Sequence, residues 1–295
     1  MKTKKFRCSS FGRLMTGAAL PTASRLTEAQ QKELSTLLQK IVLTDKQADR
    51  RDELIAKRDT PIEPKLSEGA KTYIQEEFLK DRFDYGFRFT NCFIEKGKEV
   101  EERSIRQVGA MLGYPFATKA PERYLENDFL CSSGYDWKVN KFVFDQKNVW
   151  NPSGLKLFEN DKDLPIYEWQ IRAYAMLINE LENGTIEAGA VIRSLMNPSA
   201  ELILKQARLL WVEAGNNYNE EISESFLLEV ENEFDFERKF PNIADRVKIH
   251  RVKCTQEHFE LIRIYVKLAQ EYYNSLESIC LNMNIDEINF FKNAN

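Results

Sequence analysis

Hydrophobic and polar positions along the chain change period several times, and the first regular pattern is a short internal repeat. LTEAQQKELSTLLQKIV (26–42) aligns with LTDKQADRRDELIAKRD (43–59) without a gap. In each copy a threonine stands three residues before a glutamine, which is the capping-box spacing that opens a helix. We therefore expect a helical hairpin within 26–65, ended by Pro61 and Pro64.

Downstream of the hairpin the hydrophobic period switches between that of helices and that of strands. The pattern predicts helices at about 67–82, 97–112, 165–182, 198–213 and 255–277, and strands within 128–147, 188–196 and 246–254. A helix, a strand hairpin, and then another helix and strand are typical of a mixed α/β domain. We expect this domain to cover 66–295, after a basic arm at 1–25 and the hairpin insertion.

Composition narrows the class of protein. The 295 residues are 43% hydrophobic and 30% charged, and no run approaches the roughly 18 apolar residues of a membrane span. The basic start lacks the apolar stretch of a signal peptide. Five scattered cysteines without a CxxC pair make a structural zinc site a poor fit and indicate reduced thiols. Two histidines and no GxxxxGK[ST] loop argue against a histidine triad and a P-loop ATPase. We expect a cytoplasmic protein.

The distribution of charge is more informative than the net charge of -4. Residues 1–27 carry six Lys or Arg and no acid, whereas residues 220–237 carry eight Asp or Glu and no base. Either run could be a solvated tail or surface. Alternatively, the basic arm contacts a phosphate backbone and the acidic lobe is turned away from it.

The segment GYDWKVNKFVFDQK (134–147) predicts a hairpin with an acidic face. If the chain turns at Asn140-Lys141, residue 139 faces 142 and Asp136 faces Asp145, with Cβ atoms about 4.5–5.5 Å apart. Lys147 lies two residues beyond Asp145 and shares its face. The other face forms the core through Trp137, Val139, Phe142 and Phe144.

Two opposed carboxylates destabilise a hairpin unless a cation compensates them. A divalent metal ion such as Mg²⁺ would do so. The alternative is that Lys138 and Lys147 pair with the two aspartates on a solvated face. A third carboxylate, Glu101, heads the apolar stripe of the helix at 97–112, where it costs free energy unless it is paired or bound to metal. It could equally reach solvent or pair with an arginine.

Gln170 and Tyr174 are four residues apart in YEWQIRAYAMLINEL, so a helix places both on one face. Each of these signals is weak alone. Taken in order they resemble the PD-(D/E)XK nuclease superfamily, in particular phage exonucleases related to lambda exonuclease and YqaJ-type viral recombinases. The resemblance spans about 66–277 and matches GxxxE (Gly97, Glu101), the strand-end aspartate (Asp136), D-x-K (Asp145, Lys147), and the QxxxY of RecB-type and lambda-type members (Gln170, Tyr174).

The sequence departs from that family at several positions. Gln146 replaces the usual apolar residue inside D-x-K, and Tyr135 stands where many relatives have proline. The spacing from 136 to 145 is short, and the duplicated hairpin at 26–59 is not a general family feature. No proposed ligand is lost.

The resemblance implies a restriction-endonuclease-like core, in which helices flank a central mixed sheet, and hydrolysis of DNA with one or two Mg²⁺ or Mn²⁺ ions. Lys147 would orient or help to deprotonate the attacking water. The remaining site residues would divide into metal ligands (Glu101, Asp136, Asp145 and the carbonyl of Gln146), groups that position the DNA (Gln170 and Tyr174), and candidates for gripping a 5′ phosphate (Ser10 and Arg13).

We expect an exonuclease that digests one strand of linear duplex DNA for recombination in a bacterial or phage-infected cell. The family resemblance also implies a single-strand annealing protein as partner, and a homo-oligomer. Two alternatives remain open at this point. One is an endonuclease or resolvase with the same core, and the other is a non-catalytic DNA-binding protein of the same fold.

Overall fold

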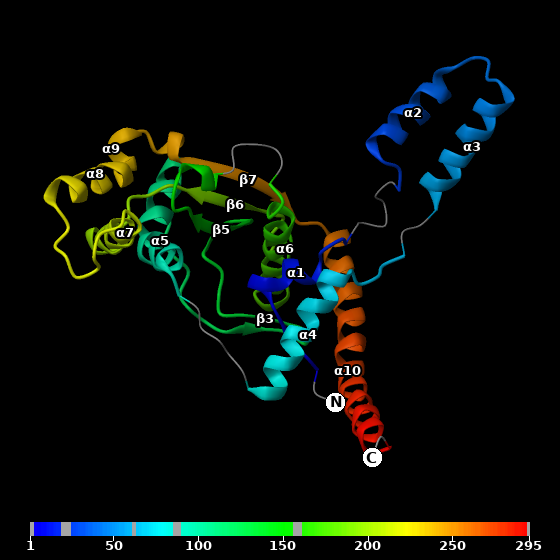
Figure 1. The fold of residues 1–295 in the computed structure, drawn as a ribbon. Coiled ribbons are helices and arrows are strands. Elements are labelled where there is room, and N and C mark those ends of the chain that lie inside the picture. Colours follow the sequence, from blue (N-terminus) through cyan, green and yellow to red (C-terminus); the bar gives the residue numbers. More distant parts are fainter. Residues whose placement is uncertain (1–2, 19–24, 61–62, 85–89, 156–160, 294–295) are drawn as a thin grey trace.

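A central sheet with helices on both faces forms the body, and a helical hairpin projects from it (Figure 1). The computed structural model describes residues 3–18, 25–60, 63–84, 90–155 and 161–293, with side chains as far as residue 280. No helix in these ranges is both long enough and apolar enough to cross a membrane.

The central sheet has four strands in the order β4–β5–β6–β7. Strands β5 and β6 run parallel, and the other neighbours are antiparallel, so the sheet is mixed as predicted. Asn140, in the left-handed conformation with φ of 50°, makes the two-residue turn between β4 and β5. The strands of this sheet are β4 (Trp137–Val139), β5 (Phe142–Asn148), β6 (Ala188–Ser194) and β7 (Val247–Lys253).

Helices α5 (Cys92–Met111) and α6 (Leu164–Leu181) cover opposite faces of this sheet. The apolar stripe of α5 packs on Trp137 and Phe144, whose rings stack with centroids 4.0 Å apart. Helix α5 begins five residues before the predicted start, because Asn91 accepts a hydrogen bond from the backbone of Ile94 and caps the helix. Phe142, expected in the core, is 41% exposed because it stands beside the turn, at the edge of the sheet.

The N-terminal segment is part of the core. It comprises β1 (Phe6–Arg7), η1 (Cys8–Ser10) and α1 (Phe11–Leu14), and its apolar side chains are fully buried. At Gly12, helix α1 lies so close to α6 that an added Cβ would stand 2.0 Å from the carbonyl oxygen of Ile166. Its lysines Lys4 and Lys5 form ion pairs with carboxylates of the body. The stretch 3–18 is therefore not a separate basic arm, since its apolar side chains hold it inside; residues 19–24 lie outside the described ranges.

Beside α6, a second small sheet and two long helices complete this side of the molecule. Strands β1, β3 and β2 pair in that order. Helix α4 packs against α10, and both join the large core under α6. Helix α10 continues well past the predicted end at 277. The elements are β2 (Leu125–Glu126), β3 (Leu130–Ser132), α4 (Glu68–Phe83) and α10 (Gln256–Asn293).

The predicted helical hairpin is confirmed as α2 (Glu28–Gln39) and α3 (Asp45–Asp59). Thr27 and Gln30 form the expected capping box, and the backbone N–H of Thr44 donates to the side chain of Gln47. Leu26, Leu34, Leu37 and Leu54 give the hairpin a small core of its own.

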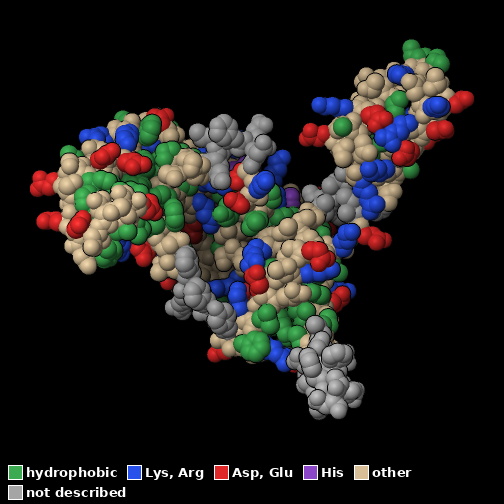
Figure 2. All heavy atoms as spheres, in the orientation of Figure 1, with side chains coloured by type: hydrophobic (Ala, Val, Ile, Leu, Met, Phe, Trp, Pro, Cys, Tyr) green, Lys and Arg blue, Asp and Glu red, His purple; other side chains and the backbone are tan. Residues whose placement is uncertain are grey.

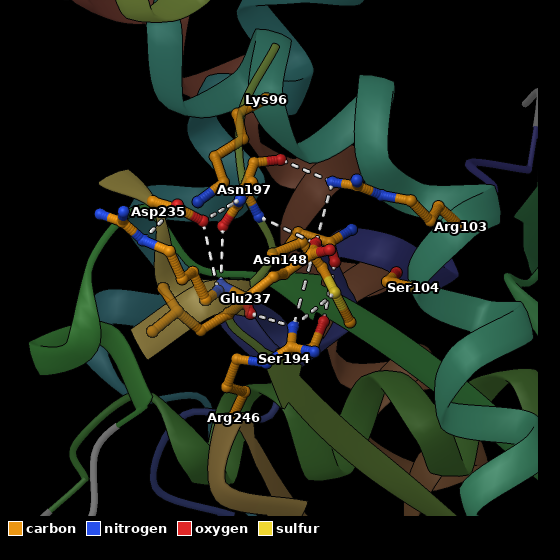
Figure 3. Close-up of polar contacts among 12 residues, drawn as sticks. Lys96, Arg103, Ser104, Asn148, Ser194, Asn197, Asp235, Glu237 and Arg246 are labelled. Atoms are coloured by element: carbon orange, nitrogen blue, oxygen red, sulfur yellow. Dashed lines mark hydrogen bonds and ion pairs between the residues drawn. The ribbon is translucent and has the colours of Figure 1, made fainter. Parts of the chain in front are cut away.

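An acidic lobe follows β6 and consists of α7 (Ala200–Glu213), α8 (Glu224–Phe234) and α9 (Phe236–Lys239). The acidic run at 220–237 is mostly the helix α8, which the hydrophobic pattern did not predict. Figure 2 shows acidic and hydrophobic side chains together over this lobe. A polar network joins the lobe to the body, in which Asn197 bonds Asp235 and the backbone of Glu237 while its carbonyl accepts from Arg103 (Figure 3).

Candidate active site

A cleft of about 570 Å³ opens between the N-terminal halves of α5 and α6, where the parallel strands β5 and β6 end. Its charged lining is evenly divided. Three acidic and three basic side chains line it, namely Glu101, Asp136, Asp163, Lys98, Lys147 and Arg193. Acidic and basic side chains therefore stand together at the carboxyl ends of the parallel strands, where they can bind both a cation and an anion.

Asp136 lines this cleft, and the buried Asp145 lies next to it, as the hairpin register predicted. The backbone pairs Val139↔Phe142 and Trp137↔Phe144 bring the residue before β4 next to Asp145. A carboxylate oxygen of Asp136 accepts a 2.5 Å hydrogen bond from the backbone N–H of Gln146. Burial, and then the charge of Asp145, raises the pKa of Asp136 to about 7. The negative charge of Asp136 and Asp145 is therefore not fully compensated by neighbouring cations.

Lys147 supplies part of the positive charge that Asp136 and Asp145 require. Its ammonium nitrogen is 2.9 Å from the carboxylate of Asp145, which is 1% exposed. Burial alone would lower the pKa of Lys147, but Asp145 and Asp136 outweigh it and raise the pKa above its ordinary value. Lys147 is therefore a cation at neutral pH. Lys138, the other lysine considered as a partner for the aspartates, pairs with Glu182 instead.

Gln170 and Tyr174 lie beneath Asp145. The side-chain amide of Gln170 donates 2.8 Å and 3.2 Å hydrogen bonds to Oδ1 of Asp145 and to the Tyr174 hydroxyl. The two residues are 3% and 5% exposed. We expected them to face DNA, but β5 and α6 enclose them, so they contact the carboxylate. Burial raises the pKa of Tyr174 above its ordinary value and keeps its hydroxyl neutral.

Glu101 faces the same cleft from α5 and is paired. Its side chain is 17% exposed, and a carboxylate oxygen lies 2.7 Å from Nζ of Lys119. This hydrogen bond raises the pKa of Lys119. The charge of Glu101 also contributes to the raised pKa of Asp136. Glu101 is thus close enough to Asp136 to share its electrostatics, with a lysine as its present partner.

The carboxylates fit a divalent cation in chemistry, although they do not form a closed ligand shell as they stand. In the described ranges, no group of three or more Asp, Glu, His or Cys side chains is close enough to hold a metal ion. Lys119 and Lys147 neutralise two of the three acids. However, the charge of Lys147, whose Nζ is 2.9 Å from Oδ2 of Asp145, only partly offsets the raised pKa of Asp136. Carboxylate oxygens of this kind are the donors that a hard metal ion requires.

The side chain of Gln146 points to the opposite face, toward α5. Its amide donates to Oγ of Ser194 at 2.7 Å, and that hydroxyl donates to Asn148 at 2.8 Å. Asn148 in turn donates to the carbonyl of Gly97 at 3.1 Å. This chain ties β5 and β6 to α5 beside the cleft, which explains why a polar residue stands inside D-x-K. Three polar residues on buried strands were the signal for it.

Ser10 and Arg13 do not line the cleft. Ser10 shares a 2.9 Å hydrogen bond with the hydroxyl of Tyr73, and Arg13 forms a 2.9 Å ion pair with Glu76 over the same ring. The fold places them on α1 and its preceding turn, against α4. Their expected role in gripping a 5′ phosphate has no support in these contacts.

Arg193 is a cleft residue that the sequence analysis missed. It is buried on β6 and forms an ion pair with the buried Asp161. An arginine inside AGAVIRSLM, an otherwise apolar strand, was the signal available, because a buried arginine requires a partner.

No protein-family model matches this sequence, and no curated protein matches it. Among solved structures the chain is similar to a phage-related exonuclease from Haemophilus somnus 129PT, with a TM-score of 0.58 and 20% identity over 94% of this chain and 96% of that one. Two structures of an alkaline exonuclease from Laribacter hongkongensis, LHK-Exo, the second in complex with dAMP, give TM-scores of 0.44 and 0.46. Their identities are 7% and 9%, over 96% and 98% of this chain and 96% of each of theirs. The first similarity shows the fold, and the expected restriction-endonuclease-like α/β class is confirmed.

Proposed function

We propose that this protein is a metal-dependent deoxyribonuclease, and that it acts as an exonuclease on linear duplex DNA. The observation that carries the proposal is that Asp136 and Lys147 line a cleft with the buried Asp145 beside them, and that Glu101 lines the same cleft. Two adjacent carboxylates that share too little positive charge, with a lysine beside them, are suited to hydrolysis of a phosphodiester.

The residues divide into ligands and positioning groups. Asp136, Asp145 and Glu101, with the backbone carbonyl of Gln146, would hold Mg²⁺ or Mn²⁺. When bound, such an ion lowers the pKa of a coordinated water and neutralises charge on the phosphate. Lys147 would orient the water or help to deprotonate it, and would stabilise the charge that develops on the phosphate oxygens.

Gln170 fixes the carboxylate of Asp145. It donates to Oδ1 of Asp145, while Nζ of Lys147 lies 2.9 Å from Oδ2. Tyr174 holds the amide of Gln170 in turn, since its hydroxyl accepts the second N–H. This arrangement is the kind of outer-shell support that orients metal-binding carboxylates. We propose that the QxxxY pair acts through Asp145 and not through direct contact with DNA.

The fold shared with a phage-related exonuclease supports an exonuclease over an endonuclease. Resection of DNA ends in the cytoplasm of a bacterial or phage-infected cell would expose single strands for recombination. A single-strand annealing protein is then the expected partner, and a homo-oligomer would keep the enzyme on one DNA end.

The test compares linear and covalently closed circular duplexes in the presence of Mg²⁺, with EDTA as the control for metal dependence. We expect progressive loss of the linear duplex alone. Nicking or cutting of closed circles at the same rate would instead favour an endonuclease.

A second experiment tests the residues. Asp145→Ala and Lys147→Ala should each abolish most of the cleavage, whereas Lys141→Ala, which removes an exposed lysine paired with Glu187, should leave it unchanged. Cleavage by the Asp145 and Lys147 variants at the parental rate would rule out this site.

A further inference from the structure

A row of basic residues crosses the sheet from the proposed catalytic centre. Lys147 on β5 lies directly opposite Arg193 on β6, and Arg193 lies opposite Lys248 on β7. Directly paired residues share one face of a sheet, and neighbouring strands are about 4.8 Å apart. The row therefore begins beside Asp145 and leads away from it in steps of one strand.

The first two members of the row face the same aromatic ring. Nζ of Lys147 is 5.0 Å from the ring centroid of Tyr167, and the guanidinium carbon of Arg193 is 5.7 Å from it. Tyr167 is on the first turns of α6 and lines the cleft with both cations. The ring thus holds two positive groups at a fixed separation on the wall that a substrate would contact.

Arg193 is paired with Asp161 in an environment that is costly for both charges. The two side chains are 8% and 4% exposed. The guanidinium contacts Oδ2 of Asp161 directly. Desolvation of two charges offsets most of the attraction in such a pair. The carboxylate of Asp161 thus occupies the position on Arg193 where another anion could bind.

A phosphate group is the anion that matches this position. The planar guanidinium of arginine binds phosphate through two parallel hydrogen bonds, as it does a carboxylate. Each DNA strand carries one phosphate for about 3.4 Å of helix rise, so a phosphate bound at Lys147 is followed closely by another.

We propose that Arg193, with Tyr167 beside it, forms a second phosphate-binding position for the nucleic-acid strand, next to the phosphate that is cleaved. Asp161 occupies Arg193 in the absence of DNA and is displaced by the strand. This inference rests on the proposed nuclease function, because it places the strand relative to Lys147. The row of cations gives the direction in which the strand leaves the catalytic centre.

The test measures how the affinity for a linear duplex oligonucleotide depends on salt, with Ca²⁺ in place of Mg²⁺, between about 50 and 200 mM KCl. The slope of log K against log salt is negative, and each lost phosphate contact makes it shallower by about 0.9. Removal of Arg193 alone would leave Asp161 buried without a partner. The double variant Asp161→Asn/Arg193→Gln avoids this problem. Its slope should be shallower than that of the parent by the amount expected for one lost phosphate contact.

The single variant Asp161→Asn tests the competition. It keeps Arg193 and removes its internal anion, so we expect tighter binding of the duplex with an unchanged slope. Arg172→Gln is the matched control, because Arg172 is also a largely buried arginine, 3.1 Å from Glu168, and does not line the cleft. Its slope should equal that of the parent.

The outcomes separate this inference from the proposed function. If the parent digests linear DNA but the double variant keeps the parental slope, or Asp161→Asn binds no more tightly, the second phosphate position is wrong and the nuclease assignment stands. If the parent cleaves no DNA under any metal condition, the nuclease assignment itself fails.

Discussion

The side-chain amide of Gln170 donates a 2.8 Å hydrogen bond to Oδ1 of Asp145, and both groups are buried. The bond fixes the orientation of the carboxylate, because a buried Asp145 has few other donors. On one side it has Lys147, and on the other it has this amide. The geometry of the proposed metal ligand therefore depends on a residue one layer behind it.

Replacement of Gln170 by Ala should lower the rate of DNA cleavage by about 10- to 100-fold, which is the usual effect of losing an outer-shell partner. The Michaelis constant for DNA should change little, because the side chain is enclosed. Initial rates over a range of DNA concentrations measure both. Gln75→Ala, which removes an exposed glutamine bound to Tyr272, is the control. A large rise in the Michaelis constant with an unchanged rate would show that Gln170 contacts DNA.

The pair between Glu101 and Lys119 should compete with metal binding. Because Lys119 neutralises Glu101, Lys119→Met should strengthen the binding of Mn²⁺, measured by calorimetry. A partly exposed ion pair contributes up to about 1 kcal/mol, so we expect a gain of up to about fivefold. Lys141→Met should not change the affinity. Weaker binding by Lys119→Met would show that Lys119 supports the metal site.

The buried Lys96 should make stability depend on pH. Its side chain is fully buried and donates to the carbonyls of Val149 and Trp150. Burial, and then the charge of Arg103, lowers the pKa of Lys96 from 10.5 to about 7. Between these two values the unfolded chain holds a proton that the folded protein has lost, so raising the pH through this window favours folding.

The corresponding measurement is urea unfolding at several pH values between about 6 and 9, since each pH unit inside the window is worth up to about 1.4 kcal/mol. The free energy of unfolding of the parent should rise relative to that of Lys96→Met as the pH increases. A difference between the two proteins that is constant with pH would mean that Lys96 keeps its proton when folded.

Two glycines should respond to alanine in opposite ways. At Gly12 a Cβ would meet the backbone of Ile166 at 2.0 Å, whereas at Gly97 it would meet nothing within 4 Å. Gly12→Ala should therefore lower the free energy of unfolding by about 1–3 kcal/mol or more, as overpacking does. Gly97→Ala should raise it by up to about 1 kcal/mol, because alanine favours a helix. Thermal unfolding of both variants decides this, and equal effects would contradict the close contact of α1 with α6.

Local patterns predicted the parts of the site that depend on strand alternation and helix spacing. The two-residue turn at Asn140 fixed the register, and the register brought Asp136 beside Asp145. The i, i+4 spacing correctly placed Gln170 and Tyr174 on one face. It could not show that this face is covered, because burial of α6 depends on packing between elements distant in sequence.

The partners that arrive from loops could not be predicted. Lys119 comes from an irregular segment after α5, and no periodicity indicates that it reaches Glu101. The pair between Arg193 and Asp161 joins β6 to the start of α6 in the same way. The lysines of the N-terminal segment are conspicuous in sequence, whereas the buried Phe6, Phe11 and Leu14 determine its location.

The burial of this N-terminal segment also has a consequence for how the chain folds during synthesis. The backbone N–H of Lys4 donates to the side chain of Gln270, 266 positions later. Contacts of such large separation carry a high loop-closure entropy and slow folding. Phe6 and Phe11 leave the ribosome long before α6 and α10 exist to cover them. The residues that close the core are therefore synthesised well before the helices that cover them.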